Sequence, residues 1–171
     1  MSDSHPGNSA AHQPLDPRVI PLEQIVHSIV VAAISLGSLV GIGIFWLVAD
    51  DVRVWVRTLP LVAWLGWTMF GLWHARTWPA RAYGHTSYRV DDEGLEIRRG
   101  VYWRVVINVP RSRVQHIDVT QGPLDRRYGL GTLVIYTAGT DYAKVELHGL
   151  EHGRALALRE QLLPTGAGDA V

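Results

Sequence analysis

Two apolar stretches near the N-terminus decide the architecture: IVHSIVVAAISLGSLVGIGIFWLVA at residues 25–49 and VWVRTLPLVAWLGWTMFGLW at residues 54–73. Each has about the twenty residues that an α-helix needs to cross the hydrocarbon core of a bilayer. Only residues 50–53 separate them, so the two helices should be antiparallel neighbours whose outer ends lie on the same side. The sequence therefore predicts an integral membrane protein with a transmembrane helical hairpin over residues 25–78.

Small residues mark one face of the first stretch, where Ala33, Gly37 and Gly41 recur every four residues. That spacing places small side chains on one helical face and lets another helix approach closely. Packing within the hairpin is the simpler interpretation. A homo-oligomer or a partner membrane protein is the alternative.

Tryptophans gather near the ends of both stretches, where an indole can place its ring in the membrane interface and its N–H in water. The predicted interfacial anchors are Trp46, Trp55, Trp73 and Trp78.

Arginines set the orientation that we expect. Arg18, Arg76 and Arg81 lie on the side shared by the two outer ends, whereas Arg53 and Arg57 lie in or near the connecting loop. Because positive charge is enriched on the cytoplasmic side, this balance favours cytoplasmic termini. Residues 1–24 are then predicted to be a flexible cytoplasmic tail.

Charge and cysteine content exclude several classes of protein. The chain has 16 Lys plus Arg and 16 Asp plus Glu, and eleven of each sign lie from Gly84 onward. A nucleic-acid binder would carry a basic excess, so nucleic acid is not an expected partner. The chain has no cysteine, which excludes disulfide scaffolds, thiol catalysis and Cys-ligated metal centres.

From Thr86 onward the sequence changes to short stretches rich in Val, Ile and Tyr, separated by Gly, Pro, Asn and Asp, as in an antiparallel sheet. The predicted strands are residues 86–90, 95–99, 102–109, 114–121, 132–137 and 142–147. Leu95 and Ile97 should face the core. A helix over residues 150–163 follows, with Ala155, Leu158 and Leu162 on one face, and residues 165–171 are expected to be disordered. The fold class is therefore α+β: a bent sheet or open barrel closed by one C-terminal helix.

Catalysis is not expected. Ser112, His116 and Asp118 superficially resemble a nucleophile, a base and an orienting carboxylate. A serine hydrolase also needs an oxyanion hole and a nucleophile on a strained turn, and the chain has no G-x-S-x-G motif. We therefore expect a protein that is not an enzyme.

Two histidine pairs are candidate ligands. His27 and His74 should lie in the same leaflet and could ligate haem, but no other redox motif accompanies them. His148 and His152 have the four-residue spacing of a helical metal site, but His148 precedes the predicted helix and no third ligand is evident. The sequence predicts no cofactor and no metal.

Several short motifs carry a family resemblance. They are YRV at 88–90, DEGL at 92–95, RGV at 99–101, VP at 109–110, RVQHI at 113–117 and TQGPLDRRYGLG at 120–131. With the preceding hairpin, they make the chain similar to the bacterial pleckstrin-homology (PH) domain membrane proteins of the YdbS type. The resemblance implies a PH-like domain over residues 79–164, held at the cytoplasmic face of a bacterial inner membrane. It implies no characterised activity.

The candidate interaction or headgroup contacts are four arginines in or beside these motifs and one tyrosine: Arg111, Arg113, Arg126, Arg127 and Tyr128. One interpretation is a local patch that meets phosphates or acidic groups of a partner. The other is surface arginines plus a structural ion pair that fixes the loop of residues 122–131.

The first predicted hairpin argues against phosphoinositide binding. Arg89, Arg98 and Arg99 flank it, at the place where phosphoinositide-binding PH domains carry their basic ligands. Here the turn is Asp91-Asp92-Glu93, whose carboxylates would repel a phosphate.

Two non-catalytic functions are compatible with these observations. The first is an interaction module that docks a protein partner, another PH-domain membrane protein among the candidates, through an open sheet edge or a groove beside the helix. The second is a sensor near lipid headgroups that uses the arginine patch. The first is preferred, because a domain tethered by two helices gains little from weak headgroup contacts and has no net positive charge.

Overall fold

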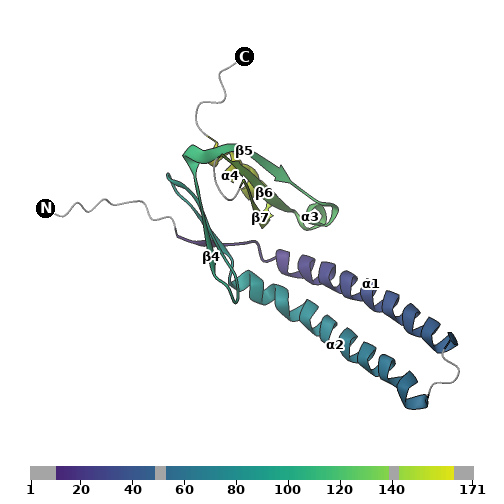
Figure 1. The fold of residues 1–171 in the computed structure, drawn as a ribbon. Helices are drawn as coiled ribbons and strands as arrows, with labels where there is room; N and C mark the ends of the chain where they lie inside the picture. The colour runs from purple at the N-terminus through teal and green to yellow at the C-terminus, as the bar shows by residue number, and fades with distance from the viewer. Residues whose placement is uncertain (1–10, 49–52, 139–142, 164–171) are drawn as a thin grey trace. The chain divides into compact units, whose positions relative to one another are not determined.

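The computed structural model describes residues 11–48, 53–138 and 143–163. The chain divides into two compact units, a helical unit of residues 20–80 and a second unit formed by residues 1–19 and 81–171 (Figure 1). The predicted loop carboxylates Asp50 and Asp51 and the C-terminal tail lie outside the described residues.

The helical unit consists of α1 (Val19–Val48) and α2 (Val54–Gly84), of 30 and 31 residues. At 1.5 Å per residue each is about 45 Å long, more than the roughly 30 Å hydrocarbon core of a bilayer. Among the described residues, α1 alone is apolar enough over its length to cross a membrane. The tryptophans, two prolines and arginines of α2 lower its mean hydropathy. Two helices were predicted and two are present, but the crossing by α2 stays a prediction.

Polar contacts join the two helices. The indole N–H of Trp64 donates to the Ser35 carbonyl over 2.9 Å, and the hydroxyls of Ser35 and Thr68 lie 3.0 Å apart. At one end of the pair, the Gln24 amide donates to the Arg76 carbonyl over 2.9 Å. Such bonds satisfy polar groups that would otherwise face lipid.

The small-residue face of α1 is not part of this contact. Ala33, Gly37 and Gly41 are exposed, and a Cβ added at either glycine would meet no atom within 4 Å. Close approach occurs instead at Gly71 of α2, where an added Cβ would lie 3.0 Å from a Val31 methyl group. The simpler interpretation of the stripe, packing within the hairpin, is therefore not what the structure contains.

The second unit contains two antiparallel sheets and one long helix. Sheet A has the order β1 (Gln13–Pro14), β2 (Ser87–Val90), β3 (Gly94–Arg99) and β4 (Val105–Pro110), and sheet B has β5 (Val114–Thr120), β6 (Leu130–Thr137) and β7 (Lys144–Glu151). The single-turn helix η1 (Arg111–Arg113) joins the sheets, the short helix α3 (Pro123–Tyr128) joins β5 to β6, and α4 (His152–Leu162) follows β7. We call this second unit the PH-like unit.

One core is shared by both sheets and α4. Alternate residues of each strand point inward, as a sheet with one buried face requires. Ile97 of sheet A, Leu133 of sheet B and Leu158 of α4 are each at most 1% exposed and belong to the same cluster. The predicted inward residues and the predicted apolar face of the C-terminal helix are confirmed; they are Leu95, Ile97, Ala155, Leu158 and Leu162.

Residues before the first helix also belong to the PH-like unit, unlike the flexible tail predicted for residues 1–24. Strand β1 pairs with β2, the backbone N–H of Asp16 donates to the Gly149 carbonyl over 2.9 Å, and α1 begins at Val19. Leu15 packs against the core. The chain therefore leaves the PH-like unit at Val19 and returns to it at Arg81.

Two connections differ from the sequence prediction. The strand predicted over residues 102–109 begins at Val105, because residues 100–104 form the β3–β4 turn and Gly100 has a φ of +121° that only glycine adopts readily. The segment 122–131 contains α3, which was not predicted. A helix of six residues is too short to show a helical pattern in the sequence.

Candidate functional site

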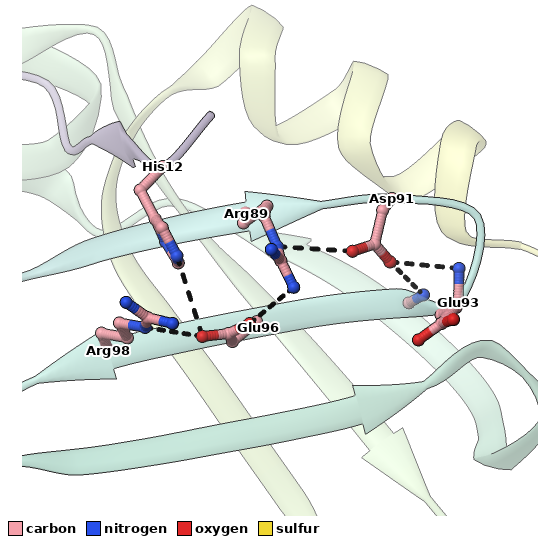
Figure 2. A network of polar contacts seen from close by, with 7 residues as sticks. His12, Arg89, Asp91, Glu93, Glu96 and Arg98 are labelled. Atoms are coloured by element: carbon pink, nitrogen blue, oxygen red, sulfur yellow. Dashed lines mark hydrogen bonds and ion pairs between the residues drawn. The ribbon is translucent and has the colours of Figure 1, made fainter. Parts of the chain in front are cut away.

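A carboxylate, Glu96, organises the outward face of sheet A (Figure 2). It accepts hydrogen bonds from Arg89 on β2 over 2.8 Å and from Arg98 on its own strand over 2.6 Å. His12, just before β1, lies 3.8 Å from it. The Glu96 side chain is only 13% exposed, so these partners compensate much of its desolvation.

The acidic β2–β3 turn is held by one of its own residues. A carboxylate oxygen of Asp91 accepts the backbone N–H groups of Glu93 and Gly94, both over 3.1 Å, and the other oxygen lies 3.4 Å from Arg89 (Figure 2). Arg89 is thus committed to two carboxylates. A phosphate arriving at this turn would have to displace them and approach Asp92 as well.

Arg111 has a structural position. Its guanidinium donates to the Gln161 carbonyl in the last turn of α4, where a cation also complements the helix dipole. Its backbone N–H bonds the Glu93 carbonyl over 2.9 Å. This arginine ties η1 to both the β2–β3 turn and α4.

The remaining predicted contacts are separated by β5. Arg113 is exposed before that strand, whereas Arg126 and Arg127 are exposed in the last turn of α3, after it. The seven residues of β5 span about 23 Å, so the four predicted arginines do not form one patch. Tyr128 is half-buried beside the α3 pair.

The loop of residues 122–131 is fixed by a cap. The Asp125 carboxylate accepts the Gly122 backbone N–H over 2.9 Å, and Gly129 ends α3 with a φ of +68°. In the described part of the chain, no ion pair joins Asp125 to either arginine of α3, so the predicted structural ion pair is replaced by this cap.

The histidines considered as catalytic residues or metal ligands contact residues close to them. His116 and Asp118 lie 2.7 Å apart on exposed β5, and His148 lies 3.0 Å from the Thr132 hydroxyl and 3.1 Å from Glu146. In the helical unit, His74 stacks on Trp78 with a centroid distance of 5.3 Å. Over the described residues, no three His, Cys, Asp or Glu side chains are grouped as metal ligands.

Two surface ion pairs shift pKa values. The hydrogen bond from Lys144 lowers the pKa of Glu146 below its ordinary value, and the same bond raises the pKa of Lys144. The hydrogen bond from the Arg18 guanidinium likewise holds the pKa of Asp16 below 3.8. Both pairs join neighbouring residues, so they order local backbone rather than form a binding site.

Strand β4 is a sheet edge that, unlike the other edges, is long and has no charged residue. Among the described residues it pairs with β3 alone. It reads VVINVP, with no charged residue, and Val106 is 54% exposed. Edge β1 is only two residues long, whereas β5 and β7 carry charged residues or histidine along their length. Proteins normally protect sheet edges with charges, prolines or short strands. An unprotected edge can accept a strand from another chain.

An aromatic and basic turn lies next to this edge. Tyr102 and Trp103 in the β3–β4 turn are 81% and 85% exposed, and Arg99 and Arg104 flank them. The strand predicted from Tyr102 is wrong at its start, because Tyr and Trp are typical of strands. Gly100 is the signal in the sequence for a turn at this place.

Comparison with known proteins gives two matches. The model of the family described as Bacterial PH domain matches residues 18–165. The UPF0699 transmembrane protein YdbS of Bacillus subtilis (strain 168) is 36% identical over 75 residues, which cover 44% of this chain and 45% of that protein. The matching segment thus spans less than half of this relative. No solved structure matches the chain.

Proposed function

The chain belongs to the bacterial PH domain family, and on that premise we propose that it is a membrane-anchored, non-catalytic module that docks a protein partner at the cytoplasmic face of the bacterial inner membrane. The family match and the transmembrane relative account for the membrane-associated PH module. Docking of a protein partner, the two membrane crossings and the orientation are our proposals.

Chain connectivity supports two crossings. Val19 and Arg81 belong to the same compact unit. A folded unit with a polar surface stays on one side of a bilayer. A chain that crosses at α1 must therefore cross again before Arg81, and α2 is the described element that can return it. Lowered hydropathy in α2 does not prevent this, because tryptophans are favourable near the membrane interface.

The uncharged β4 edge is the observation that carries the docking proposal. A strand added along β4 would gain backbone hydrogen bonds, and exposed Val106 would be covered. The edge runs from Val105, beside the β3–β4 turn, to Pro110 at the acidic end of sheet A, next to the β2–β3 turn. A segment of six residues suits a short peptide strand.

Site-specific photocrosslinking in intact cells tests this function. A photoreactive amino acid replaces Asn108, which is exposed on β4, and the tagged chain is purified in mild detergent for mass spectrometry. We expect a stoichiometric adduct with one partner, and Val106→Lys should lower its yield about tenfold, because the added strand would have to desolvate a lysine. Gln115→Lys on the exposed part of β5 is the matched control.

Three results would contradict docking at β4: no adduct, an adduct indifferent to Val106→Lys, or equal loss with Gln115→Lys. An adduct with a second copy of the chain would identify the partner as the protein itself.

The alternative function, a lipid-headgroup sensor that uses the predicted arginines, has less support. Arg111 is engaged by α4, and β5 separates Arg113 from Arg126 and Arg127.

A further inference from the structure

We propose that the β3–β4 turn, residues 100–104, is a second membrane contact that seats the PH-like unit on anionic lipid. The turn concentrates exposed apolar surface. Of the six large hydrophobic residues exposed in the described part of this unit, four lie here or directly after it: Tyr102, Trp103, Val105 and Val106. Aromatic side chains at the tip of a turn, with basic neighbours, match the composition of membrane interfaces.

The basic residues form a concavity beside the aromatic tip. It has a volume of about 400 Å³, and its cationic lining is Arg98, Arg99 and Arg104; His85 also lines it. Arg98 is paired with Glu96, but Arg99 and Arg104 form no ion pair with any described carboxylate. Two exposed guanidiniums next to two exposed rings can bind lipid phosphates while the rings enter the headgroup layer.

Register places this turn at the tethered end of sheet A. Ser87, the first residue of β2, pairs with Arg98, so the β3–β4 turn lies at the end of the sheet where the chain arrives from α2. Gly84 and His85 line the same concavity as the arginines. Only six residues of sequence lead from Trp78, the last predicted interfacial anchor, to Gly84. This short connection keeps the tethered end of sheet A within reach of the headgroup layer.

Charge distinguishes the two ends of sheet A. The tethered end carries the concavity's arginines, whereas the opposite end is the turn of Asp91, Asp92 and Glu93. An anionic membrane surface attracts the first end and repels the second, which orients the unit. In that orientation β4 runs away from the bilayer and its edge remains open to a protein partner, so the two proposals are compatible, and different variants test them.

The test uses the full chain in vesicles of phosphatidylcholine alone or mixed with phosphatidylglycerol. Because the natural chain has no cysteine, Tyr102→Cys and, as a control at the opposite end, Asp92→Cys can each carry one environment-sensitive fluorophore. We expect headgroup spin-labelled lipid to quench the label at position 102 in anionic vesicles and iodide to reach it poorly. The label at position 92 should behave in the opposite way.

Matched variants test the residues. Near an anionic surface each arginine contributes about fivefold to binding, so the double change Arg99→Gln and Arg104→Gln should lower the ratio of seated to released units roughly 25-fold. Trp103→Ser should also release the turn without disturbing the core, because this side chain is 85% exposed. Arg126→Gln with Arg127→Gln removes the same charge from α3 and should change nothing. Added inorganic phosphate should not release the turn if lipid, rather than free anion, is the ligand.

Several outcomes would overturn the proposal. Iodide access at position 102 equal to that at position 92 in anionic vesicles would mean that the turn stays in water. Equal release by the α3 variant would assign the effect to net charge. Protection in native membranes but not in vesicles of pure lipid would mean that the turn contacts a protein. None of these results depends on the β4 crosslink, so docking and seating can fail separately.

Discussion

Truncation of Leu158 to alanine should strongly destabilise the PH-like unit. The side chain is fully buried and contacts the core that both sheets share, so its loss leaves a cavity between them. Leucine-to-alanine changes at such sites cost about 2–5 kcal/mol, and we take about 3 kcal/mol here. Leu156→Ala is the matched control, because Leu156 lies on the same helix but is only half-buried. Its expected cost is about 1 kcal/mol.

Pulse proteolysis of the full chain in detergent measures the difference. Protease cleaves the PH-like unit once urea unfolds it, so the urea midpoint reports this unit rather than the helical one. With an m-value of about 1.5 kcal/mol per molar urea, Leu158→Ala should lower the midpoint by roughly 2 M and Leu156→Ala by less than about 1 M. Equal midpoints for the two variants would refute the conclusion that α4 closes the core through this face.

Three further changes test local features of the PH-like unit. Gly94→Ala should prevent folding, because a Cβ would lie 2.1 Å from the Val109 carbonyl oxygen at a φ of +153°, whereas Gly153→Ala, with no atom within 4 Å, should be neutral or stabilising; circular dichroism and proteolysis distinguish them. Glu96→Gln should cost about 1–2 kcal/mol by weakening its bonds to two arginines, while Glu93→Gln in the exposed turn should cost little; equal urea midpoints would contradict the role of the network. Asp16→Asn tests pH dependence, because the pKa of Asp16 is lowered in the folded protein. The natural protein should be more stable than the variant above pH 3.8, and this difference in the free energy of unfolding should disappear as the pH falls through the lower folded pKa. A difference that persists in stronger acid would exclude this carboxylate as its source.

The sequence predicted most of the elements because their signals are local. Length and hydropathy indicated the two long helices, and period-two alternation placed Leu95 and Ile97 inward in a strand. Helical spacing identified the buried face of Ala155, Leu158 and Leu162. The motifs after residue 86 identified the family to which the chain belongs.

The candidate site could be predicted only in part, because it depends on which residues far apart in sequence come together. Arg113 and Arg126 are thirteen residues apart in the sequence, and one basic patch was predicted to contain both. The extended strand β5 instead separates them. Trp103 looked like part of a strand, and only the φ of Gly100 and the register of β3 with β4 make it the exposed tip of a turn.

By itself, then, the sequence determined the apolar helices, the strand pattern and the family, since each follows from side-chain periodicity or a contiguous motif. The tertiary structure decided that residues 11–19 fold with the PH-like unit and that β4 is the unprotected edge. It also placed the basic turn at the tethered end of sheet A. The physical reason is that pairing, register and burial are set by contacts between distant segments, which no local pattern encodes.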